Sequence, residues 1–167
     1  MMRANLKTAL AITLIALCGS TQARDLVGEA RYQGLGNGSR LSLEQVGEGN
    51  RARIEQQGSA QWMQASQQGT GNRVNLTQAG ANNVLQAQQV GSYNALNVVQ
   101  TGSHNQAGVT QRGQENTAQV VQNGAYNQAF VSQNGQGNQA DVQQNGNGQK
   151  ASLSQTGDNM NAQIKQW

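Results

Sequence analysis

Amide side chains recur in this sequence of 167 residues at a spacing regular enough for them to act together. A side-chain amide both donates and accepts hydrogen bonds, so amides stacked in register can bond to one another along a ladder. Glutamine stands at twelve positions, each eleven residues after the last: Gln45, Gln56, Gln67, Gln78, Gln89, Gln100, Gln111, Gln122, Gln133, Gln144, Gln155 and Gln166. Asparagine follows the glutamine by five residues in eight units: Asn50, Asn72, Asn83, Asn94, Asn105, Asn116, Asn127 and Asn138. We predict that these amides form the functional ladder; Gln61, Gln149 and Met160 depart from the asparagine rule.

Groups that could catalyse a reaction or bind a metal have no comparable arrangement. His104 is the single histidine, Cys18 is the single cysteine, and the eight acidic residues follow no fixed spacing. The glycine-rich segment 34–38 lacks the Lys-Ser/Thr that completes a phosphate-binding loop. The sequence therefore predicts a protein that is not an enzyme and that has no catalytic, metal-binding or cofactor-binding residues.

The elements that position the amides are predicted to be β-strands. Apolar residues stand two and four residues before each glutamine, so the regular positions alternate with the period of a strand. A glycine two residues after each glutamine marks a tight turn and opposes the alternative, a helix with eleven residues in three turns. These turn glycines are Gly47, Gly58, Gly69, Gly80, Gly91, Gly102, Gly113, Gly124, Gly135, Gly146 and Gly157.

Each unit of eleven residues is interpreted as a strand of five or six residues followed by a turn. In the unit that ends at Gln56, Ala52 and Ile54 share the inner face with the amide, whereas Arg51 and Arg53 face outward. Two units would form one coil, with two strands facing each other across a thin core. The predicted fold class is all-β: a β-solenoid of about six coils and parallel stacked strands over residues 41–167, about 29 Å long.

The overall composition on its own is typical of a disordered, amide-rich chain. Hydrophobic residues make up 35% of the sequence, charged residues make up 11%, and proline is absent. In a disordered tract, however, nothing requires the amides to recur at a fixed spacing. Here the glutamines keep their spacing of eleven residues over twelve units. The pattern favours an ordered rod whose stability is collective, since one coil alone buries too little apolar surface to stay folded.

Residues 1–23 are predicted to be a secretory signal peptide. Arg3 and Lys7 precede an apolar segment, and Ala23 ends a small-residue cleavage site. The apolar segment is shorter than the about 20 residues that span a bilayer as a helix, so we expect no integral membrane segment. Cleavage would leave nine basic residues against eight acidic ones, a balance that indicates no nucleic acid partner. Residues 24–40 are off-period and are predicted to form a flexible N-terminal segment.

The two edges of the predicted rod have no recognisable protection. Soluble solenoids end in atypical capping repeats, whereas here the regular pattern continues to Gln166. An uncapped edge presents backbone N–H and C=O groups that can pair with another chain. The residues alone therefore predict end-to-end self-assembly into a cross-β fibre.

The repeats resemble those of the curlin family, the subunits of extracellular curli amyloid in Gram-negative bacteria. The family motif, Gln-x-Gly-x-x-Asn-x-Ala-x-x-x-Gln, stands intact from Gln45 and in the four consecutive units that begin at Gln100, Gln111, Gln122 and Gln133. The resemblance implies a fibre subunit that is secreted through the periplasm, stays at the cell surface and supports biofilm matrix, adhesion and aggregation. It also implies partners: further copies of the chain, a partner curlin, an outer-membrane secretion pore that recognises residues 24–40, and accessory factors.

Curlins comprise a major fibre subunit and a minor, surface-attached nucleator, and the sequence has features of both. The segment from Asn50 to Gln56 is similar to minor-curlin repeats, whereas an intact final repeat ending in Trp167 is closer to the major type. We favour the nucleator and keep the major subunit as the alternative. A third alternative, a monomeric secreted β-solenoid that binds glycans or ice, would need a regular outward array that this sequence lacks.

Overall fold

The computed structural model describes residues 11–17, 28–35 and 38–167, with side chains from residue 38 onward. This part of the chain contains fourteen strands and no helix. The strands are β1 (Ala11–Leu17), β2 (Gly28–Leu35), β3 (Arg40–Val46), β4 (Arg51–Ser59), β5 (Trp62–Thr70), β6 (Arg73–Ala81), β7 (Val84–Ser92), β8 (Ala95–Ser103), β9 (Gln106–Gln114), β10 (Thr117–Ala125), β11 (Gln128–Gln136), β12 (Gln139–Asn147), β13 (Lys150–Thr156) and β14 (Asn161–Gln166).

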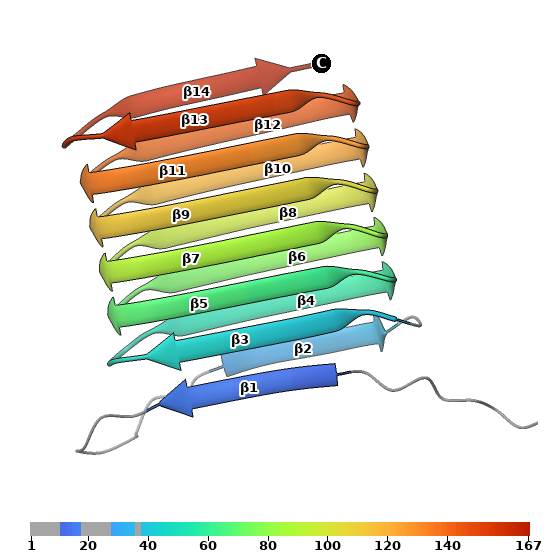
Figure 1. The fold of residues 1–167 in the computed structure, drawn as a ribbon, viewed down its shortest axis with the longest axis horizontal. Helices are drawn as coiled ribbons and strands as arrows, with labels where there is room; N and C mark the ends of the chain where they lie inside the picture. The colour runs from blue at the N-terminus through green and yellow to red at the C-terminus, as the bar shows by residue number, and fades with distance from the viewer. Residues whose placement is uncertain (1–10, 18–27, 36–37) are drawn as a thin grey trace, which may run out of the picture.

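Two parallel sheets face each other, one built from the odd-numbered strands and the other from the even-numbered strands (Figure 1). Within each sheet the partner of a residue lies 22 positions further along the chain, as Gln78 pairs with Gln100. From β3 to β14 the chain therefore winds through six coils, each of 22 residues. The predicted all-β solenoid with parallel stacked strands is confirmed.

The strands are longer than the five or six residues predicted, because the glycine that follows each glutamine continues the pairing. β4 to β12 each contain nine residues, and Gly80 still pairs with Gly102 in the next coil. At these glycines φ lies between 110° and 146°, a conformation that disfavours any residue with a Cβ. The corner is therefore part of the sheet and repeats in every coil.

A second corner position, two residues after the glycine, has a left-handed backbone throughout. There φ lies between 52° and 70° at Gly49, Ala60, Gly71, Asn82, Tyr93, His104, Glu115, Tyr126, Gly137, Gly148 and Asn159. The sequence prediction missed this position. The sequence feature that could have revealed it is that six of these eleven residues are Gly or Asn, the residue types that tolerate left-handed φ.

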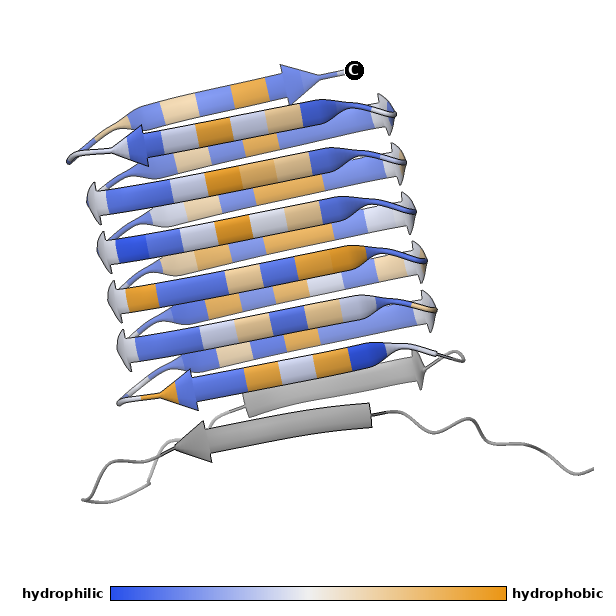
Figure 2. Ribbon diagram, viewed as in Figure 1, coloured by the Kyte–Doolittle hydropathy of each residue, from blue (hydrophilic) through white to orange (hydrophobic). Residues whose placement is uncertain are grey.

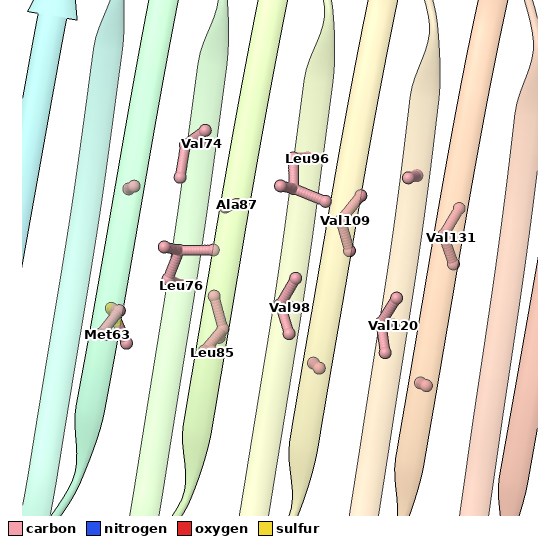
Figure 3. Close-up of a cluster of buried hydrophobic side chains, with 14 of the residues drawn as sticks. Met63, Val74, Leu76, Leu85, Ala87, Leu96, Val98, Val109, Val120 and Val131 are labelled. Carbon is pink, nitrogen blue, oxygen red and sulfur yellow. The ribbon is translucent and has the colours of Figure 1, made fainter.

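The core is a single layer of apolar side chains between the two sheets. β3 to β13 each contribute two inward apolar residues, and all of these are buried in one cluster. Figure 3 shows side chains from neighbouring strands meeting in this layer, with Met63, Leu76 and Leu85 beside smaller residues such as Ala87. The outward residues are mostly polar, so apolar bands run across otherwise hydrophilic strands (Figure 2).

Two strands precede the regular coils. β1 pairs with β3, and β2 pairs with β4 with a register shift between Tyr32 and Leu35. β1 lies within the predicted signal peptide, whose residues 1–10 and 18–23 lie outside the described residues. β2 lies within segment 24–40, and Arg40 at its end begins β3, so part of that segment is in strands; residues 24–27 and 36–37 lie outside the described residues. The processing and export roles of both segments stay predictions.

Candidate functional site: the buried amide ladders and their two edges

The twelve periodic glutamines form two continuous ladders, one along each sheet. Nε2 of each glutamine donates to Oε1 of the glutamine 22 residues later, at 2.6–3.1 Å in all ten pairs. One ladder runs from Gln45 to Gln155 and the other from Gln56 to Gln166. All their interior members are buried. Each ladder is thus a chain of hydrogen bonds in which every donor points toward the C-terminal edge of the rod.

From Gln56 onward, the second Nε2 hydrogen of each ladder glutamine ties one sheet to the other. Gln67 on β5 donates to the Arg51 carbonyl oxygen at the start of β4, at 3.2 Å. The same bond recurs from Gln56 to Gln166, at 2.9–3.5 Å. Since the acceptor always lies 16 residues earlier, on the opposite sheet, the glutamines also close the rod at its corners. A fully bonded buried amide adds about 1 kcal/mol per hydrogen bond and fixes the register.

The asparagines have a different task from the glutamines, although the sequence placed both in one ladder. Asn72 Nδ2 donates to the Gly91 carbonyl oxygen at 2.8 Å, and its Oδ1 accepts from the Asn94 backbone N–H at 3.1 Å. All eight periodic asparagines, the first and the last included, make this pair of bonds to the following coil. Side-chain bonds between asparagines at these corners are limited to Asn94–Asn72 and Asn116–Asn94 within residues 38–167. Asparagine therefore fastens the corner backbone of one coil to the next.

Gln61 shows why asparagine is preferred at the corner. Gln61 Nε2 reaches the Gly80 carbonyl oxygen at 3.0 Å, as an asparagine would. Its longer side chain misplaces the acceptor, however, and the buried Oε1 of Gln61 has no hydrogen-bond partner. The buried Oε1 of Gln149 also lacks a partner, but Gln149 lies in the last coil and has no following corner N–H to accept from. A buried acceptor without a donor costs about 1–3 kcal/mol.

The first member of the even-strand ladder is also incomplete. Gln56 is 2% exposed, and its Oε1 is buried without a partner. The residue that pairs with Gln56 on β2 is Tyr32, and the residue that pairs with Gln45 on β1 is Ala16. Neither is a glutamine, so β1 and β2 extend the sheets without extending the ladders.

The predicted turn glycines occupy the first corner position of all eleven corners, Gly47 to Gly157. A Cβ on Gly91 would collide with the Gly113 carbonyl oxygen of the next coil. Close stacking of the corners therefore depends on glycine, and this stacking brings the Gly91 carbonyl within reach of Asn72.

The outward faces carry isolated charges and aromatic side chains without a repeated array. Arg51 and Arg73 are exposed and pair in register, and Arg53 bonds to Glu55 at 2.6 Å. Phe130 is exposed and packs against Gly108, where an added Cβ would lie 2.9 Å from the ring.

His104 lies in a corner, where its ring stacks on Tyr126 with 4.8 Å between centroids. Among the described residues there is no group of three or more His, Cys, Asp or Glu side chains that could hold a metal ion. The described residues also include no helix that is long and apolar enough to cross a membrane.

The geometry defines a class: a parallel β-solenoid whose interior is held in register by stacked amides and whose last coil, β13 and β14, has no further described strand paired to it. Residues 113–145 match the family model described as the curlin associated repeat. This match spans three consecutive corners and the strands between them, and it confirms the resemblance to the curlin family. No curated protein matches the sequence.

Proposed function

We propose that this protein is a structural subunit of an extracellular curli-type amyloid fibre that assembles end to end. The observation that supports this most directly is the pair of amide ladders, which run unbroken to the outermost strands β13 and β14. At this edge no described strand covers β13 or β14, whereas a solenoid that served as a monomer would need such an edge covered. Here the inner surface of one coil matches that of every other coil, so a second chain can continue both ladders.

The irregular outward faces favour a fibre over a monomeric glycan-binding or ice-binding module. The first residues of the successive odd-numbered strands from β3 to β13 lie in register and form one outward column. They are Arg40, Trp62, Val84, Gln106, Gln128 and Lys150. No side chain repeats along it except one pair of glutamines. Regularity is confined to the interior, which is the surface that stacking coils share.

Within this proposal we favour the minor, surface-attached nucleator, with the major fibre subunit as the alternative. Its partners would be further copies of itself and a partner curlin, with export through the periplasm and an outer-membrane secretion pore. The fibre would support biofilm matrix, adhesion and aggregation at the cell surface. Seeding in both directions separates the subtypes: a nucleator accelerates the partner curlin and remains at the cell surface, and a protein that does neither is not the nucleator.

Incubation of the purified protein tests the fibre proposal. We expect a lag, followed by thioflavin-positive fibres with a reflection at about 4.8 Å along the fibre axis. A protein that stays monomeric at high concentration would contradict the proposal.

The amide ladder is tested by alanine substitutions in matched pairs. Gln56→Ala and Gln166→Ala remove members of the even-strand ladder. The controls Gln57→Ala and Gln143→Ala remove outward glutamines from strands of the same sheet. We expect fibre growth to slow clearly in the first pair only, because a deleted ladder amide leaves its neighbour unpaired, at about 1–3 kcal/mol. Equal slowing in all four variants would refute the role given to the ladder.

A further inference from the structure

The two amide ladders have a direction, and the direction leaves different groups at the two edges of the rod. Every ladder bond runs from Nε2 of one coil to Oε1 of the next coil toward β14. At the β4 edge, Gln56 Oε1 is buried and lacks a donor. A buried acceptor of this kind indicates that an N–H group belongs there.

The opposite edge holds the missing donor. Gln166 on β14 accepts from Gln144 at 2.8 Å and donates to the Lys150 carbonyl oxygen at 3.0 Å. A side-chain amide has two N–H hydrogens, and in every interior coil the second one bonds to the next glutamine. Ala162 and Ile164 beside it are only partly buried, so the inner face of β14 is open to a further strand.

We propose that a second copy of this chain docks head to tail, with β14 of one copy pairing with β4 of the next and β13 pairing with β3. Gln166 Nε2 then donates to Gln56 Oε1, and Gln155 continues onto Gln45, which preserves the register of the interior coils across the junction. This inference rests on the proposed fibre and specifies its polarity and register. A tail-to-tail contact would place two donors against each other and leave Gln56 unpaired.

Docking requires β1 to leave the β3 edge and β2 to leave the β4 edge. β1 lies within the predicted signal peptide, so cleavage on export would free the β3 edge. β2 pairs six residues with β4, and its register is broken between Tyr32 and Leu35. By contrast, β4 and β6 pair nine residues without a break. An incoming β14 would restore a regular pairing and supply the amide that Tyr32 does not, so β2 is the weaker occupant. β2 thus covers the β4 edge in the monomer, and in the fibre β14 of a second copy takes its place.

The same register sets which outward charges meet at the junction. By the spacing seen in the other coils, Lys165 on β14 falls opposite Glu55 on β4, and Lys150 on β13 falls opposite Arg40 on β3. The first pair attracts and the second repels, since both are in-register neighbours in a parallel sheet. Two lysines on the same edge therefore have opposite effects on docking.

Two variants with the same change of charge test this polarity. Lys165→Glu places a carboxylate opposite Glu55, and we expect seeded elongation to slow roughly two- to fivefold. Lys150→Glu places a carboxylate opposite Arg40, and elongation should quicken by a similar factor. The double variant Lys165→Glu with Glu55→Lys should recover the elongation rate. Circular dichroism of the fresh monomers checks that the variants fold alike.

Carbodiimide cross-linking of the native fibre gives a second, independent reading. Within one chain β14 and β4 are separated by four intervening strands of the same sheet, roughly 24 Å apart at the usual strand spacing. A Lys165–Glu55 cross-link must therefore join two chains, and we expect to find it by mass spectrometry in fibres and not in monomers.

The outcomes separate this inference from the fibre proposal. Normal fibres in which both lysine variants slow alike, or in which Lys165→Glu accelerates growth, would overturn the head-to-tail register and leave the fibre intact. Fibres without the Lys165–Glu55 cross-link would overturn it as well. Failure of the native protein to form any fibre would remove the proposed function itself.

Discussion

Each corner of the rod holds one residue in a left-handed conformation, and this residue decides how much strain the corner carries. Glycine and asparagine adopt this conformation readily, whereas a residue such as Ala60 or Glu115 adopts it at a cost of about 1–2 kcal/mol. The backbone N–H of this residue donates to the previous coil, as Tyr93 does to the Thr70 carbonyl oxygen at 2.9 Å. The bond between coils holds the strained conformation in place.

Replacing a strained corner residue by glycine should therefore stabilise the fold. For Ala60→Gly, with φ at 52°, we expect the free energy of unfolding to rise by about 1 kcal/mol. Ala79→Gly is the matched control on an outward strand position, where the same change should lower it by about 0.5–1 kcal/mol. Urea titration of freshly purified monomer measures both. A loss of stability in Ala60→Gly would show that the corner is not strained.

At the residue scale the sequence predicted positions better than roles. The period of eleven placed Gln56 and Asn72 on the inner face correctly, because alternation along a strand leaves no other arrangement. It did not separate the ladder glutamines from the corner asparagines. Their amides differ by one methylene, and only the position of the glycine carbonyl in the next coil decides which length fits.

At the scale of the element, strand and corner form one unit. The glycine after each glutamine pairs with its counterpart in the next coil, so each strand extends past the residues that alternate. The sequence predicted the alternation and missed this extension, because glycine is normally a signal for the end of a strand. Here the corner glycines stack so closely that their carbonyl oxygens occupy the space of a Cβ.

Two glycine substitutions distinguish the corners from the strand faces. Gly91→Ala requires a Cβ at φ 119° against the Gly113 carbonyl oxygen, and we expect it to destabilise the monomer by more than about 2 kcal/mol. Gly108→Ala lies on an outward strand face, where only the Phe130 ring must move. Thermal unfolding followed by circular dichroism should show a large loss for the first variant and little change for the second. Similar losses of stability in both variants would mean that close stacking of the corner glycines does not determine the stability of the monomer.

At the scale of the whole molecule, the rod is a stack whose coils differ only on the outside. The repeat made the six coils predictable from the sequence, since each coil copies the one before. β1 and β2 were not predictable in this way, because neither carries the periodic glutamine. Their positions follow from backbone pairing with β3 and β4 alone.

The stack fixes the linear density of a fibre built from it. Six coils at about 4.8 Å each give one chain per about 29 Å of fibre axis, provided that junctions keep the spacing of the interior. Mass-per-length measurement by scanning transmission electron microscopy checks this value for single filaments. A seventh layer at the same strand spacing would lengthen the repeat to about 34 Å, and that value would indicate that β1 and β2 remain in place at every junction.

The register between coils also constrains how a gene for such a protein can lengthen or shorten. Insertion or deletion of one whole coil, 22 residues, leaves every remaining residue on its own sheet and its own face. A change of eleven residues preserves the inner and outer faces but moves each later strand to the opposite sheet, so columns such as Arg51 and Arg73 are divided between the two sides of the rod. A change whose length is not a multiple of eleven residues breaks both ladders at the point of change. Viable size variants should therefore come in steps of whole coils, with the outward faces free to diverge between steps.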